Sequence, residues 1–146
     1  MSACVFCRLI AGELPAAFVH RDGLVVAFMD AGQVNDGHVI VATARHVDTI
    51  YGLGDDEAAA VFRTAVRIAR AVKREFGAAG VTLLQANEPA GFQTVPHFHL
   101  HVLARHADDG VGLTWPAKRP PFERLQALAG RTRSALAAEA GPAAAS

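Results

Sequence analysis

The chain has 146 residues, 51% of them hydrophobic and 19% charged, and its 14 Lys and Arg side chains equal its 14 Asp and Glu side chains. This length and composition are typical of one globular domain with a real core. The formal net charge is zero, so the chain lacks the excess of basic residues that is typical of nucleic-acid-binding proteins, and we expect no nucleic-acid partner. The apolar runs are too short to cross a bilayer, so we expect no membrane partner either. We predict one domain over residues 1–140 and a disordered tail over 141–146.

The first residues show no charged segment followed by a long apolar stretch, which argues against a secretory signal. Cys4 and Cys7 are the only two cysteines. Two cysteines are not the pattern of a disulfide-rich secreted domain. A cytoplasmic protein is therefore expected.

Short apolar runs rich in Val and Ile predict the strands of the first half. Leu24–Phe28 and Val39–Ala42 have the composition of buried strands. We expect Ala17–His20 to pair with the first of them across the turn at 21–23. The segment 30–37 contains Gly, Asn and Asp, and predicts a loop.

A long amphipathic helix is predicted next. We expect it to begin at Asp55 or Asp56, whose carboxylates can cap its N–H groups, and to end at Gly77, a favoured C-cap residue. Apolar residues at helical spacing predict the face that packs on the core, namely Ala58, Val61, Phe62, Ala65, Ala69, Val72 and Phe76.

The second half predicts two more strands, Val81–Gln85 and Pro96–Leu103, and a helix near Phe122–Leu136. Five or so strands with short connections and one long helix indicate an α+β fold around a mostly antiparallel sheet. A parallel sheet would need more crossover helices than this sequence offers.

Three histidines, His97, His99 and His101, alternate with apolar residues. In a strand they would share one face, while the apolar residues pack on the long helix from the other. Imidazoles at this spacing can surround one phosphate. They can also hold a Zn²⁺ ion, so both interpretations stay open at this point.

The stretch from Gln93 to Leu103 resembles the signature of the histidine triad (HIT) family. Residues 5–15, 27–30 and 37–41 also resemble that family, and Asn87 stands where the family places an asparagine. The resemblance covers roughly residues 4–105. It implies a HIT-like fold with a five-stranded sheet, one long helix packed on it and a C-terminal helix, together with a homodimer.

The resemblance also implies a nucleotide hydrolase that cleaves nucleoside phosphoramidates or related purine nucleoside monophosphate adducts, including adenylates. His99 would attack the α-phosphorus, and water would then cleave the nucleotidyl-histidine. His101 would hold phosphate oxygens or help to protonate the leaving group. Asn87, Gln93 and Thr94 would donate uncharged hydrogen bonds to the phosphate. The catalytic set carried over from the family is His97, His99, His101 and Asn87.

For the nucleoside, the resemblance assigns Asp30 to the two ribose hydroxyls, because an ionised carboxylate only accepts hydrogen bonds. It assigns the apolar walls around the base to Phe6, Leu9, Leu14 and Phe28. The simpler interpretation of Phe6 and Phe28 is that they are ordinary core residues.

Zinc-binding branches of the family imply one structural Zn²⁺ per chain, held by Cys4, Cys7, His46 and His97. The cysteines by themselves would equally suit two buried thiols, whereas a structural zinc site needs four ligands. His38 is expected to shape a turn.

Two alternatives remain. In the first, the triad holds a catalytic zinc ion, although no nearby acidic residue is paired with it. In the second, the chain is a non-catalytic nucleotide-binding module, although such a module would not need to keep His99. Asp36 stands where relatives usually carry Pro, and substrate preference therefore stays open.

Overall fold

The computed structural model describes residues 4–139, so the expected tail at 141–146 lies outside the described residues. By its contacts the chain divides into two units, one up to residue 111 and one from residue 112. Among the described residues, no helix is both long and apolar enough to cross a membrane.

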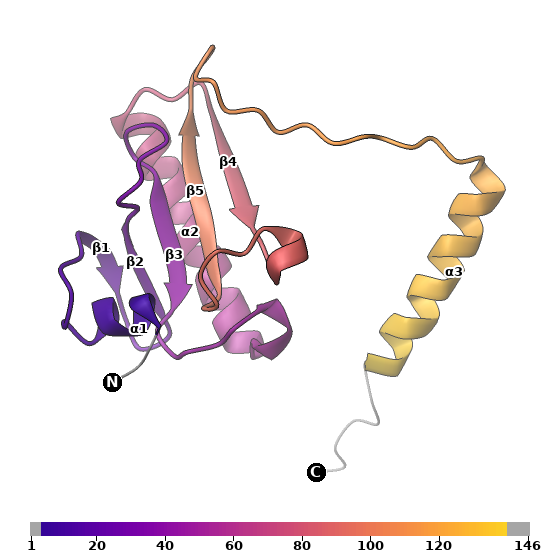
Figure 1. Cartoon of the computed structure of the whole chain (residues 1–146), viewed down its shortest axis with the longest axis horizontal. Coiled ribbons are helices and arrows are strands. Elements are labelled where there is room, and N and C mark those ends of the chain that lie inside the picture. Colours follow the sequence, from indigo (N-terminus) through magenta and orange to yellow (C-terminus); the bar gives the residue numbers. More distant parts are fainter. Residues whose placement is uncertain (1–3, 140–146) are drawn as a thin grey trace, which may run out of the picture. The chain divides into compact units, whose positions relative to one another are not determined.

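The first unit is built on one antiparallel sheet with the strand order β1-β2-β3-β5-β4. Figure 1 shows the sheet with α2 behind it and the short helix α1 in front. The strands are β1 (Phe18–Arg21), β2 (Val25–Met29), β3 (Val39–Thr43), β4 (Gly80–Gln85) and β5 (His99–Arg105). The helices are α1 (Val5–Ile10), α2 (Asp55–Glu75) and two 3₁₀ turns, Ile50–Gly52 and Pro89–Gly91.

The two faces of the sheet carry separate apolar clusters, as the alternation of side chains along a strand requires. On one face, Val25, Val41 and Val102 pack with Val61 and other residues of α2. On the other face, the cluster contains the α1 residues Phe6, Leu9 and Ile10 together with Val26, Phe28, Ile40 and Ala42. The expected α+β fold is confirmed, and Phe98, Leu100 and Val102 do pack toward the long helix.

Helix α2 departs from the prediction at its start and on its outer face. Its N-cap is Gly54, and the Glu57 carboxylate accepts the Gly54 N–H at 3.1 Å, so neither Asp55 nor Asp56 is the cap. Phe62 is 59% exposed and Ala58 is exposed, so only part of the predicted stripe is core. The helix ends at Glu75 with Phe76 as its C-cap, one residue before the predicted Gly77, which follows in the left-handed conformation with φ +60°.

Strand β5 begins at His99, three residues later than predicted. Pro96 has no N–H to give to a ladder, and the His97 N–H donates to the Val95 carbonyl at 2.8 Å. His97 therefore lies in a turn, and only His99 and His101 belong to the strand.

The second unit contains α3 (Phe122–Glu139), which includes the predicted helix 122–136 and extends three residues further. None of its described residues is buried.

Candidate active site and metal site

The two strand histidines lie on the face of the sheet that α1 covers. In the register of β3 with β5, His99 is opposite Ala42 and His101 is opposite Ile40, and both partners belong to the α1-side cluster. His99 is 4% exposed, and the Phe6 ring meets it edge-on at 5.1 Å between centroids. Residues 99 and 101 are thus held in place by the pairing of β5 with β3 and β4.

The protonation of His99 follows from one hydrogen bond. Its Nδ1 lies 2.7 Å from the carbonyl oxygen of His97. A carbonyl can only accept, so Nδ1 carries the proton and Nε2 of the neutral ring keeps its lone pair. Burial lowers the pKa of His99, and the His97 carbonyl and the Asp30 charge oppose this only in part. The result is a neutral imidazole whose Nε2 keeps a lone pair, as a nucleophilic histidine requires.

A second group of side chains brings Cys4, Cys7, His46 and His97 together, as predicted. Their four ligand atoms all lie within 4.8 Å of one another. Cys4 Sγ is 3.4 Å from His97 Nδ1, and Cys7 Sγ is 3.2 Å from His46 Nδ1 and 3.6 Å from His97 Nδ1. The cysteines come from the start of α1, so the cluster ties that helix to the turn before β5.

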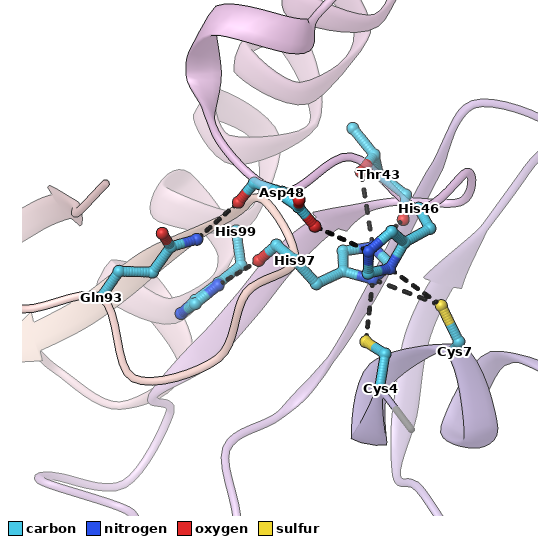
Figure 2. A network of polar contacts seen from close by, with 8 residues as sticks. All are labelled: Cys4, Cys7, Thr43, His46, Asp48, Gln93, His97 and His99. Carbon is cyan, nitrogen blue, oxygen red and sulfur yellow. Dashed lines mark hydrogen bonds and ion pairs between the residues drawn. The ribbon is translucent and has the colours of Figure 1, made fainter. Parts of the chain in front are cut away.

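The far nitrogens of these two imidazoles are also engaged, as Figure 2 shows. His97 Nε2 donates to the Thr43 carbonyl at 2.9 Å, and His46 Nε2 lies 2.8 Å from the Asp48 carboxylate. Both Nδ1 atoms are then unprotonated and face the sulfurs, which is the usual arrangement of metal-bound histidines. Burial further lowers the pKa of His97 and so favours its neutral form. Two sulfurs and two ring nitrogens fit a metal ion, and they are the donors of structural zinc sites.

A third group, Asp30, His38 and His101, was not predicted as a unit. His38 Nε2 is 2.8 Å from His101 Nδ1 and 3.3 Å from the Asp30 carboxylate. One of these two ring nitrogens carries the proton of the bond between them, and we assign it to His38 Nε2, because the Asp30 carboxylate lies nearer to that atom than to His101 Nδ1, which is 3.7 Å away. His101 is then protonated on Nε2. Burial, with His99 and His38 nearby, lowers the pKa of His101 to about 4.

This third group could itself hold a metal by its composition, but the direction of its rings favours a hydrogen bond. The ring centroids of His38 and His101 are 5.1 Å apart. With the nitrogens at 2.8 Å, that separation places both nitrogens on the line between the rings. The N–H of one ring therefore points at the lone pair of the other, and the two nitrogens do not converge on a third point.

His38 is the site residue that the sequence interpretation missed, since it was assigned only to a turn. It is 4% exposed and has a direct ring partner. Strand alternation could have found it, because His38 shares its face with Ile40 and Ala42, which lie opposite His101 and His99.

The predicted nucleoside walls lie beside Asp30. A cavity of about 420 Å³ is lined by Phe6, Leu9 and Phe28 together with Asp30. Leu14 is not among its lining residues, which include the neighbouring Pro15. Phe6 and Phe28 are also core residues, in edge-to-face contact at 5.2 Å. The two interpretations of these rings are therefore compatible.

The predicted phosphate donors lie in the loops around the triad. Asn87 Oδ1 accepts the Ile50 N–H at 2.7 Å, and its amide also pairs with Gln85. Gln93 Nε2 donates to the Asp48 carbonyl at 2.6 Å, so that residue braces the segment next to His46. Thr94 lines a hollow with Cys4 and His46.

Comparison with known proteins gives a consistent result. The HIT domain family model matches residues 11–108. "Protein hit" of Bacillus subtilis is 35% identical over 137 residues, covering 92% of this chain and 94% of that protein. The adenosine 5'-monophosphoramidase hnt1 of Schizosaccharomyces pombe is 26% identical over 127 residues, covering 86% of this chain and 92% of that protein.

Solved structures agree with this. The crystal structure of a HIT family protein from Bacillus anthracis has a TM-score of 0.87 at 34% identity, covering 92% of this chain and 97% of that one. A Zn-bound histidine triad family protein from Mycobacterium smegmatis has a TM-score of 0.71 at 29% identity, covering 91% and 97%. On the sequence signature, the fold and these matches, the chain belongs to the HIT family.

Proposed function

We propose that the protein is a nucleotide hydrolase that cleaves nucleoside phosphoramidates or related purine nucleoside monophosphate adducts through a nucleotidyl intermediate on His99. The observation that carries the proposal is the bond from His99 Nδ1 to the His97 carbonyl, which leaves Nε2 as the nucleophilic nitrogen. The name of the S. pombe relative, an adenosine 5'-monophosphoramidase, supports the substrate class.

In this mechanism, Nε2 of His99 forms a bond to the α-phosphorus and the bond from phosphorus to the amine leaving group breaks. The amine would take its proton from His101 Nε2–H or from solvent. Water would then attack phosphorus and break its bond to Nε2, and the proton that water loses would return to His101 or to solvent. Each displacement is easier than direct attack by water. His101 presents its Nε2–H as a donor to a phosphate oxygen or to the leaving group, since its Nδ1 accepts from His38.

Substrate recognition is proposed around the cavity beside Asp30. The carboxylate would accept hydrogen bonds from the ribose hydroxyls, while Phe6, Leu9 and Phe28, which line the same cavity, would contact the base. For Leu14 the same role rests on the family resemblance alone. Asn87, Gln93 and Thr94 would donate to the phosphate. The side-chain amide nitrogens of Asn87 and Gln93 each carry two N–H groups, and one of them is already bonded within the loops. The second N–H group of each would donate to the phosphate.

We propose that the Cys4, Cys7, His46 and His97 cluster holds one Zn²⁺ per chain. A Zn-bound relative and the donor set support this choice of metal. The ion would be structural, since four protein ligands complete a tetrahedral shell and leave no position for a substrate. The alternative of a catalytic metal within the triad is disfavoured, because His97 Nδ1 faces the cysteines and His101 Nδ1 faces His38.

A homodimer is also proposed, formed by α2 and β4. Phe62 on α2 is 59% exposed, and the edge strand β4 exposes Leu83 and Leu84. Exposed apolar side chains beside an unpaired strand edge are typical of an association surface. Light scattering at micromolar concentration is expected to give twice the mass of one chain, and a monomer would contradict the proposal.

The mechanism is tested by His99→Ala with adenosine phosphoramidate. Removing a nucleophile is expected to lower kcat by on the order of 10⁴-fold, while adenosine monophosphate still binds. Intact-mass analysis of quenched wild-type enzyme should detect the nucleotidyl adduct, and the variant should lack it. His106→Ala is the matched control, since its imidazole is exposed and lies outside all three clusters. Turnover by His99→Ala close to that of wild type would refute the mechanism.

A further inference from the structure

The loop between β2 and β3 carries a site residue at each end. Asp30 follows β2 and His38 precedes β3, and the Asp30 N–H donates to the His38 carbonyl at 3.0 Å. Both residues belong to the hydrogen-bonded group with His101. The shape of this loop therefore decides whether His38 reaches its partner.

One side chain inside the loop, Gln33, bonds to both ends of it. Its amide nitrogen donates to the carbonyls of Asp30 and His38, each at 2.7 Å. Its amide oxygen accepts the N–H groups of Gly37 and His38, each at 3.1 Å. Two carbonyl partners on one end and two N–H partners on the other fix the orientation of the amide without ambiguity.

A separate residue ties the loop to β5. Asn35 Nδ2 donates to the Ala104 carbonyl at 2.8 Å and to the Asp109 carboxylate at 3.0 Å. Asn35 thus anchors the loop to the sheet, whereas Gln33 sets its internal shape. Within residues 4–139, Gln33 is the one residue whose side chain bonds to the backbone of His38.

We propose that Gln33 is a positioning residue that holds His38 in line with His101, and this inference rests on the proposed function. The His38–His101 bond is 2.8 Å long, its two nitrogens lie on the line between ring centroids 5.1 Å apart, and His38 is almost fully buried. Hydrogen bonds weaken steeply with distance and angle, so a small shift of the residue 38 backbone breaks the pair. His101 then loses the partner that fixes its proton on Nε2.

The test uses two variants of the metal-loaded full chain. Gln33→Met keeps the length of the side chain and removes all four hydrogen bonds. Gln33→Glu keeps the shape of the side chain but places a carboxylate oxygen against the Asp30 and His38 carbonyls, so we expect the same loss of kcat and of the imidazole signal as in Gln33→Met. Gln126→Met in α3 is the matched control, because that glutamine belongs to none of the three clusters. The readouts are kcat and KM with adenosine phosphoramidate, thermal unfolding, and the imidazole N–H signals in ¹⁵N-labelled protein.

For Gln33→Met we expect kcat to fall about 10- to 100-fold, the range for a displaced catalytic group, with a smaller change in KM. The N–H signal of the His38–His101 bond should shift or disappear. The control variant Gln126→Met should keep both the kcat and the imidazole signal of wild type. A lower melting temperature with unchanged kcat per folded molecule and an unchanged imidazole signal would show a purely structural role and overturn the proposal. Absence of turnover in wild type would refute the proposed function alone, because the imidazole signal still tests Gln33.

Discussion

The chain contains two imidazole clusters that look alike in composition and behave differently. At one end of the site, His46 and His97 face Cys4 and Cys7 with Nδ1. At the other, His38 and His101 face each other beside Asp30. Each cluster has two imidazoles and additional anionic or sulfur groups, and each gathers its members from distant parts of the sequence.

The difference lies in the second nitrogen of each ring. In the cysteine cluster, a carbonyl and a carboxylate engage both Nε2 atoms, so both Nδ1 lone pairs converge. In the other cluster, one ring donates to the next, and the lone pairs do not converge. Outer hydrogen-bond partners thus decide whether a pair of histidines suits a metal ion or a proton.

Removal of the two sulfurs should have the largest effect on the contrast between the two clusters, because it should abolish metal binding and lower the free energy of unfolding. We expect about one Zn²⁺ per chain in freshly prepared reduced protein, and none in a Cys4→Ser, Cys7→Ser variant. Its free energy of unfolding should fall by about 4 kcal/mol or more, the linkage value at a thousandfold excess over the dissociation constant. Metal analysis and denaturant unfolding measure both, with His106→Ser as the control. Chelation that reduced turnover per folded molecule more than stability would instead indicate a catalytic metal.

A methyl group at Gly37 should disturb only the hydrogen-bonded cluster. Gly37 has φ +92°, and a Cβ there would overlap the Phe76 ring, 2.6 Å from Cε2. Strain from the left-handed backbone and overpacking against Phe76 should together lower the free energy of unfolding of Gly37→Ala by about 3 kcal/mol, as measured by denaturant unfolding. Gly77→Ala is the matched control, since Gly77 has φ +60° and open space around it, and should cost only about 1 kcal/mol. Equal losses of unfolding free energy in the two variants would show that the Phe76 ring moves aside without a cost in stability. Metal content should be unchanged in both.

The neutral state of His101 should appear as a pH dependence of stability. Its pKa is about 4 in the folded chain and 6.5 when unfolded, so between these values the unfolded chain binds more protons. Stability due to this group is therefore fully present above about pH 6.5 and is lost as pH falls toward 4, by at most about 3 kcal/mol. Asp30, His38 and His99 face the same ring and can also contribute to the pH dependence. Comparing the stability of wild type with that of His101→Gln at each pH separates the contribution of His101 from theirs. Parallel stability curves for the two proteins over this range would contradict the assignment.

Asp30 should give the smallest effect. Loss of a charge-assisted hydrogen bond to ribose predicts that Asp30→Asn weakens ribonucleotide binding by about 1.5–3 kcal/mol, with 2′-deoxy analogues losing less. The KM ratio of ribose to deoxyribose substrates measures this difference. Asp30 also accepts the Gly32 N–H at 2.8 Å, so stability is recorded as well. A ratio equal to that of wild type would leave Asp30 as a residue of the loop and of the His38 cluster only.

The sequence predicted the strands of the sheet well, because β2 and β3 are short runs of buried apolar residues bounded by loop residues. It failed where tertiary contacts override local pattern. Helix α1 has only six residues and no side-chain cap, so nothing local predicts it. The N-cap of α2 is Gly54, stabilised by Glu57, which in turn pairs with the distant Arg45.

In the candidate site, the metal ligands could be named only through the family resemblance, since they come from three separate segments. Alternation predicted correctly that His99 and His101 share a face. It could not predict that His97 leaves the strand, because this depends on the turn at Pro96. Alternation along β3 also places His38 on the face of Ile40 and Ala42, but its pairing with His101 depends on the register of β3 with β5, which the local pattern does not specify.

One feature of residue 97 bears on how this family can change during evolution. Its ring faces the cysteines, but its main-chain carbonyl sets the proton of His99. Every residue has that carbonyl, so replacing the imidazole leaves the acceptor for His99 in place as long as the turn keeps its course. On the function proposed above, a side-chain substitution at residue 97 would therefore remove a metal ligand and leave intact the hydrogen bond that orients the nucleophile.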